Sequence, residues 1–203
     1  MKSANVLIVG VGGQGVILAS DILAEVGMEY GLDVKKSDSL GMAQRGGGVV
    51  SHVRWGKRVF APLVEKGGAD FLLGLEQLEA ARWAPYLKPG AMAVVSDVVM
   101  VPVSAINSAV PYPGWPQVKA ILEQGGNRVY LLPTTELGRE LANPRAINIL
   151  MLGFLSVFLE VPESVWLEHI RHKLNARFVE PGLRAFARGR QEAAAMISAK
   201  ETK

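Results

Sequence analysis

The feature that most constrains the fold is an apolar strand that runs directly into a glycine-rich turn and a helix. Residues 4–9 are short and rich in apolar, β-branched side chains, as expected of a central parallel strand buried on both faces. From residues 16–30 the apolar positions recur at roughly helical spacing, and Gly31 is a natural stop. A strand, a glycine turn and a helix in this order predict a Rossmann-like start to the chain.

The rest of the first two thirds repeats the alternation of strand and helix. Further strands are predicted at 32–35, 49–55, 69–75, 91–96 and 127–132, with a return strand at 58–60. Helices are predicted at 76–87, 116–123 and 135–141, and a long mobile loop at 37–48. The repeated order predicts an α/β fold, in which a mostly parallel sheet is covered by helices.

The last third is predicted to be helical. Asn143-Pro144 has the pattern of a helix start, and the apolar run that follows to Leu159 predicts a buried helix. A second helix is expected from Pro162 and a third over residues 182–203. We therefore expect one domain over residues 1–203, with a sheet region at 1–142 and a helical region at 143–203 packed on it.

Composition narrows the function classes. The chain has no cysteine, which excludes disulfides, a thiol nucleophile and any cysteine-held iron–sulfur cluster. A net charge of +3 without a concentrated basic block argues against nucleic acid. The N-terminal apolar run meets glycines too soon for a signal peptide or a membrane span. We expect a cytoplasmic chain, and its slight apolar surplus fits a buried interface, including a homodimer when the chain is alone.

The glycine turn itself is the first motif with chemistry in it. Gly10, Gly12 and Gly15 satisfy G-x-G-x-x-G directly after a predicted strand. In that context glycines allow a tight turn and let a phosphate approach backbone amides at the start of a helix. The alternative is that the glycines only let the helix and strand pack closely. Both interpretations stay open at the level of sequence.

An NAD-dependent dehydrogenase is the weakest interpretation of this turn. Such an enzyme needs an acidic residue about twenty positions further on to bind the ribose. The candidates Glu29, Asp33 and Asp38 fit that position poorly, and no catalytic proton donor can be placed.

The second motif is Ser39-Leu40-Gly41-Met42-Ala43-Gln44-Arg45-Gly46-Gly47-Gly48. It follows a predicted strand, where open α/β sheets place their ligands. The guanidinium of Arg45 beside glycine amides suits a phosphate or a carboxylate, as in coenzyme A or an acidic partner loop. The alternative is a solvated hairpin with no ligand.

No metal site is predicted. His169 and His172 are three residues apart on a predicted helix, a spacing that two ligands of one metal can have. Without cysteine and without an evident third ligand, a pair of surface histidines is the better interpretation. The chain also offers no residue to which a catalytic role can be assigned.

Together the two glycine motifs resemble a known family. GVGGQGV at residues 10–16 and KKSDSLGMAQRGGGVVSHVRWG at residues 35–56 are similar to the gamma-type subunits of thiamine-dependent 2-oxoacid:ferredoxin oxidoreductases, the indolepyruvate enzymes among them. Weaker similarity covers Ala69-Asp70, residues 86–90 and Asn148 ahead of Leu152-Gly153. The chain departs from the family at Gly182, where an asparagine is usual.

The resemblance implies a heteromeric enzyme. A larger partner subunit would carry thiamine diphosphate, magnesium and iron–sulfur clusters, and would oxidatively decarboxylate an aryl pyruvate of the indolepyruvate type to an acyl-CoA. Coenzyme A would be the co-substrate and ferredoxin the electron acceptor, reached through the complex. This chain would hold no cofactor alone and would not be active alone.

We therefore expect one crevice at the strand ends, facing coenzyme A or the active site of the partner. Its candidate residues are Gly10, Gly12, Gly13, Gln14, Gly15, Gln44, Arg45, Gly46 and Gly47. The competing hypothesis is a free-standing nucleotide-binding or regulatory module that uses the same glycine loop and joins no redox complex.

Overall fold

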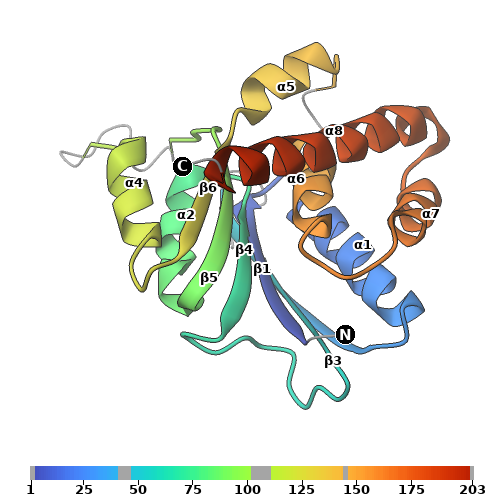
Figure 1. Ribbon diagram of the computed structural model, residues 1–203, viewed down its shortest axis with the longest axis horizontal. Coiled ribbons are helices and arrows are strands. Elements are labelled where there is room, and N and C mark those ends of the chain that lie inside the picture. The colour runs from blue at the N-terminus through green and yellow to red at the C-terminus, as the bar shows by residue number, and fades with distance from the viewer. Residues whose placement is uncertain (1–2, 41–46, 102–110, 144–145, 202–203) are drawn as a thin grey trace.

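A computed structural model describes residues 3–40, 47–101, 111–143 and 146–201, and it contains a six-stranded sheet with helices on both faces (Figure 1). The strands are β1 (Ala4–Val11), β2 (Asp33–Leu40), β3 (Gly48–Gly56), β4 (Ala69–Gly74), β5 (Leu87–Ser96) and β6 (Arg128–Leu132). Their order across the sheet is β2-β3-β1-β4-β5-β6.

The sheet is mostly parallel, as the alternation of strands and helices predicts. β1, β4, β5 and β6 run parallel to one another. β3 is antiparallel to both of its neighbours, β1 and β2, so among the described strands it alone runs against the rest. The sheet therefore has two distinct ends. Its carboxyl edge holds the loops after β1, β4, β5 and β6 and the start of β3, and its amino edge holds the opposite loops.

Helices cover the two faces unequally. The helices are α1 (Val16–Glu29), α2 (Gln77–Trp83), the 3-10 turn η1 (Ala84–Tyr86), α4 (Trp115–Leu122), α5 (Thr134–Glu140), α6 (Ile147–Ser156), α7 (Glu163–Lys173) and α8 (Ala176–Glu201). Figure 1 shows α1, α6, α7 and α8 gathered on one side of the sheet and α2 and α4 on the other. The helical last third is confirmed.

The alternation of side chains in β1 feeds two apolar cores. Val6 and Ile8 point to the α1, α6 and α8 side, whereas Leu7 and Val9 point to the α2 and α4 side, and all four are fully buried. The central part of β1 is apolar on both faces because neither face meets water there.

Two glycines let α6 and α8 cross at close range. A Cβ added at Gly189 would lie 1.9 Å from the carbonyl oxygen of Leu150, and one at Gly153 would lie 2.1 Å from that of Phe186. Any side chain at either position would force the helix backbones apart. The crossing fixes the helical region against the sheet, since α6 also contacts α1 and β5.

Several predicted boundaries are wrong. β2 continues to Leu40 through the polar residues assigned to a mobile loop, because β3 pairs with it along its whole length. Residues 58–60 form no strand, since the amide of Val59 donates instead to the Asp33 carboxylate at 2.8 Å. Lys88-Pro89-Gly90 lies inside β5 rather than ending a helix.

The helix starts of the last third also differ from expectation. α6 begins at Ile147 and ends at Ser156, short of the predicted span from Asn143-Pro144 to Leu159; Pro144 itself lies outside the described residues. α8 begins at Ala176, six positions ahead of the predicted start, and runs through Pro181. Within the described ranges, no helix is long and apolar enough to cross a membrane.

Candidate functional site

The glycine loop leaves the carboxyl edge of the sheet between β1 and α1. The amide of Gln14 donates to the Val11 carbonyl at 3.1 Å, which closes a tight turn. Gly13 has a φ of 98° and Gly15, the N-cap of α1, a φ of 81°. Residues with a Cβ rarely adopt such angles, so the backbone itself requires glycine at both positions.

Two glycines of the motif are packing glycines. A Cβ at Gly15 would lie 2.3 Å from Nδ2 of Asn148, which donates to the Gly15 carbonyl oxygen at 3.1 Å. A Cβ at Gly10 would lie 2.7 Å from Oε1 of Gln14. Both positions thus have the close packing that the packing alternative requires, and ligand contact at Gly10 and Gly15 stays a prediction. Asn148, buried in α6, is the partner that the sequence could suggest only through the family resemblance.

The side chain of Gln14 points into the protein. Its Oε1 accepts a hydrogen bond from the Val11 amide at 2.7 Å, and its Nε2 donates to the Leu75 carbonyl at 2.9 Å. Leu75 directly follows β4, so this one amide ties the ends of two parallel strands together. A contact between Gln14 and a ligand stays a prediction.

Gly12 and Gly13 form the open part of the loop. Gly13 is exposed, and a Cβ built on it would meet no atom within 4 Å. The amide of Gly12 donates to the Gly47 carbonyl at 3.0 Å. The structure thus brings the first motif against the end of the second. Gln44, Arg45 and Gly46 lie outside the described residues, and their place in the crevice stays a prediction.

A buried carboxylate, Glu76, organises the loop after β4. It is 1% exposed. Its Oε2 accepts from the Glu79 amide at 2.9 Å, and its Oε1 accepts from the Met100 amide at 3.2 Å and from the Tyr112 hydroxyl. Burial and this hydrogen bond raise the pKa of Tyr112 far above its ordinary value. The sequence did offer one sign of Glu76, because it is an acidic residue directly after a predicted buried strand.

Glu79 lies beside the second motif. It is 6% exposed, and its Oε2 would be 2.7 Å from a Cβ at Gly48, so a side chain at position 48 would collide with it. Burial raises the pKa of Glu79, although Arg82 opposes this with an ion pair at 2.8 Å. Because Glu79 sits in the middle of an ordinary helical pattern, the sequence did not single it out.

The acids considered for ribose binding are unsuited to it. β3 separates β2 from β1, whereas a dinucleotide site needs an acid at the carboxyl end of the strand beside β1. Asp33 begins β2, at the amino edge, and Glu29 ends α1 at that same edge. The Asp38 carboxylate accepts from the Ser51 hydroxyl at 2.6 Å and pairs with Lys36 at 2.6 Å.

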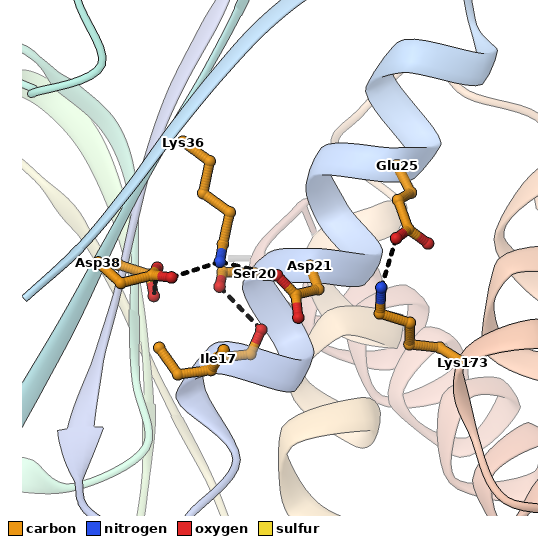
Figure 2. Close-up of polar contacts among 8 residues, drawn as sticks. Ile17, Ser20, Asp21, Glu25, Lys36, Asp38 and Lys173 are labelled. Atoms are coloured by element: carbon orange, nitrogen blue, oxygen red, sulfur yellow. Dashed lines mark hydrogen bonds and ion pairs between the residues drawn. The ribbon is translucent and has the colours of Figure 1, made fainter. Parts of the chain in front are cut away.

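Lys36 in turn joins β2 to α1. Its Nζ lies 2.7 Å from the Asp21 carboxylate of α1 as well as contacting Asp38 (Figure 2). Burial disfavours the charge on Lys36, but the hydrogen bonds to Asp21 and Asp38 outweigh burial and raise its pKa. Figure 2 also shows Lys173 of α7 reaching Glu25 of α1. These contacts hold α1 against β2 and α7, and they pair the carboxylates of Asp21, Asp38 and Glu25 with lysines.

The histidine pair does not form a metal centre. Nδ1 of His169 lies 3.6 Å from the Glu25 carboxylate, and His172 is exposed. In the part of the chain that the structure describes, no group of three histidine or acidic side chains is close enough to hold a metal ion.

Sequence comparison with known proteins supports the family resemblance of the two glycine motifs. The chain is 33% identical to the indolepyruvate oxidoreductase subunit IorB of Archaeoglobus fulgidus over 193 residues, which cover 93% of this chain and 94% of that one. It is 32% identical to the protein of the same name in Thermococcus kodakarensis over 200 residues, covering 97% and 99% of the two chains.

Solved structures share the fold. The gamma subunit of a keto/oxoacid ferredoxin oxidoreductase from Geobacter sulfurreducens superposes with a TM-score of 0.71 at 24% identity, covering 95% of this chain and 99% of that one. A 2-oxoglutarate:ferredoxin oxidoreductase from Magnetococcus marinus gives a TM-score of 0.75 at 20% identity, covering 96% of this chain and 32% of that longer one.

The family assignment rests on nearly the whole chain. Residues 5–192 match the family described as pyruvate ferredoxin/flavodoxin oxidoreductase. This span includes both glycine motifs, the buried Glu76 and the crossing of α6 with α8. The resemblance inferred from the motifs is thus confirmed: the chain belongs to the pyruvate ferredoxin/flavodoxin oxidoreductase family.

Proposed function

We propose that this chain is the small, cluster-free subunit of a cytoplasmic 2-oxoacid:ferredoxin oxidoreductase that acts on aryl pyruvates of the indolepyruvate type. The larger subunit would carry thiamine diphosphate, magnesium and iron–sulfur clusters and would form an acyl-CoA. The proposal is supported by relatives over 30% identical along nearly their full length, which are named as indolepyruvate oxidoreductase subunits.

The observation that carries the site is the hydrogen bond from the Gly12 amide to the Gly47 carbonyl at 3.0 Å. It joins the two motifs that were separate in the sequence, at the edge of the sheet where α/β folds bind ligands. Gly13 beside it is exposed and has open space around it. We infer that this part of the carboxyl edge faces coenzyme A or the active site of the larger subunit.

The residues of this chain do not fit the electron-carrying cofactors. It has no cysteine to ligate a cluster. Among the described residues, no three histidine or acidic side chains are grouped closely enough to hold a metal ion. The role we assign to this chain is therefore to contact co-substrate through backbone amides and to complete the assembly, with no catalytic residue of its own.

The test is co-expression of this chain with the candidate larger subunit, followed by anaerobic purification. We expect the two chains to copurify. Ferredoxin reduction that depends on both an aryl pyruvate and coenzyme A should require both chains, and either chain alone should be inactive.

The opposite result would favour the free-standing module. A chain that is folded but neither copurifies with the larger subunit nor changes its activity would contradict the proposal. Nucleotides should then be titrated against the isolated chain, since a free-standing nucleotide-binding module would bind them without any partner.

A further inference from the structure

The loop between β3 and β4 carries a run of exposed apolar side chains at the amino edge. We call Phe60, Ala61, Pro62 and Leu63 the apolar tip. Phe60 is 83% exposed and Leu63 55% exposed, and the two residues between them are exposed as well. In Figure 1 this teal loop projects from the lower end of the sheet, away from the glycine loop. Consecutive exposed apolar residues do nothing for folding and usually mark an interaction surface.

Side chains of the sheet form hydrogen bonds at both ends of the apolar tip. The residues that flank it, Val59 and Val64, are buried. The Asp33 carboxylate accepts from the Val59 amide at 2.8 Å, and Nδ1 of the buried His52 accepts from the Val64 amide at 3.1 Å. Both ends of the loop are thereby fixed to the sheet.

The tip itself is bound by a guanidinium. Nη1 of Arg54 donates to the carbonyl oxygens of Ala61 at 3.0 Å and Leu63 at 3.2 Å, and Nε of Arg54 donates to Asn5 at 3.0 Å. The Arg58 guanidinium lies 4.9 Å from the centre of the Phe60 ring. A loop already ordered before binding loses little conformational entropy on binding, which favours affinity.

The surroundings of the apolar tip are basic. The loop carries Lys57, Arg58 and Lys66 against one acidic residue, Glu65. Within the described residues, neither Lys57 nor Lys66 forms an ion pair, and both are exposed. A surface that fits this loop must therefore offer an apolar pocket with carboxylates at its rim.

We propose that the apolar tip is a docking element that inserts into an apolar, acid-rimmed pocket of the larger subunit, with Phe60 as the main anchor. The inference rests on the proposed function in one respect, namely that the larger subunit is the partner. It places a protein contact at the amino edge, at the opposite end of the sheet from the glycine loop.

The experiment measures the affinity of this chain for the tagged larger subunit by anaerobic biolayer interferometry. Phe60→Ser should raise Kd by at least tenfold, and Phe60→Ser with Leu63→Ser by more, because large central anchors dominate interface energies. Ile121→Ser is the matched control, since Ile121 is 38% exposed but lies on α4, and its Kd should stay within twofold of the unaltered chain.

A charge variant tests the rim of the pocket. Lys57→Glu with Lys66→Glu should weaken binding several-fold at low salt and reduce the dependence of Kd on salt. Thermal unfolding of every variant should match that of the unaltered chain, which separates a lost contact from a lost fold.

The outcomes distinguish this inference from the proposed function. If the unaltered chain binds the larger subunit and the Phe60 variants bind it within twofold of the same Kd, the docking inference is wrong and the proposed function stands. If the Phe60 variants instead turn a dimer of this chain into a monomer and leave that Kd unchanged, the tip binds a second copy and the inference is also wrong. If the unaltered chain does not bind the larger subunit, both fail.

Discussion

The two ends of the sheet use their side chains in opposite ways. At the carboxyl edge, polar side chains form hydrogen bonds with backbone groups of the protein itself, as Gln14, Glu76 and Asn148 do. At the amino edge, the loop after β3 is also tied to the sheet by side-chain hydrogen bonds, but it presents Phe60 and Leu63 to solvent.

Because of this difference, substitutions at the two edges have to be interpreted differently. A change of Gln14 or Asn148 alters the packing of the carboxyl edge as well as any ligand contact, so a loss of activity in such a variant does not identify a ligand. A change in the apolar tip removes a surface that the fold does not use, so its effect on assembly can be interpreted directly. Four predictions test this contrast, from the largest expected effect to the smallest.

The largest effect is expected for Gly15→Ala. The positive φ alone costs about 1 kcal/mol or more, and the collision with Asn148 should bring the loss of unfolding free energy to about 3 kcal/mol. The matched control is Gly31→Ala, whose φ is 80° against 81° at Gly15, but with no atom within 4 Å of the new Cβ. Urea denaturation measures both, and equal losses would show that Asn148 does not restrict the loop.

The next effect is expected for Gln14→Leu. It leaves the Val11 amide and the Leu75 carbonyl without their partner, which should lower the unfolding free energy by about 2 kcal/mol. Gln117→Leu is the control, since Gln117 also accepts from a backbone amide, that of Gly114, but in an exposed position. A loss at position 14 no larger than at position 117 would argue against a buried tie between β1 and β4.

A smaller, pH-dependent effect is expected at His52. Burial lowers its pKa below the ordinary value of 6.5, so on acidification the unfolded chain takes up a proton before the folded chain does. The stabilisation from neutral His52 is therefore present above pH 6.5 and is lost as the pH falls below it.

The measurement is chemical denaturation of the unaltered chain and His52→Asn between pH 7 and pH 5. Asparagine lacks this titration, so the deficit of the variant at pH 7 should narrow toward pH 5. Glu79, whose pKa burial raises, acts in the opposite direction in both proteins and cancels in the difference. If the loss of unfolding free energy in His52→Asn instead grew larger on acidification, His52 would not be a neutral hydrogen-bond acceptor in the folded chain.

The smallest effect on stability is expected for Phe60→Ser. Because Phe60 is 83% exposed, the unfolding free energy should change by no more than about 0.5 kcal/mol. Calorimetry of the isolated chain checks this. A loss of about 2 kcal/mol or more would mean that the ring packs on the fold and that the contrast between the two edges is overstated.

The local structure at the carboxyl edge could be predicted from the sequence. The unbroken apolar pattern and the glycines predicted β1, the turn and α1 to within two residues, because strand, turn and helix propensities act over a few neighbours. The chemistry of the glycines was left between packing and ligand contact. The structure shows close packing around Gly10 and Gly15 and open space at Gly13, and ligand contact by any glycine of the loop stays a prediction.

Contacts between distant parts of the chain could not be predicted from the sequence pattern. Asn148 is 133 positions from Gly15, and no residue pattern near either one indicates their contact. β3 enters the sheet antiparallel between β1 and β2, which no local pattern reveals. The exposure of Phe60 was missed for the same reason, since a short apolar run between charges resembles a strand until its neighbours are known.

The most direct test of the central claim, that the carboxyl edge faces coenzyme A or the partner's active site, is the kinetics of the assembled two-chain enzyme with Arg45→Ala. Arg171→Ala, on the exposed surface of α7, is the control. We predict that Arg45→Ala assembles normally but shows a KM for coenzyme A raised about tenfold or a turnover lowered to a similar extent, with no change for the control. Unchanged turnover and unchanged coenzyme A dependence in a correctly assembled Arg45→Ala enzyme would contradict the account.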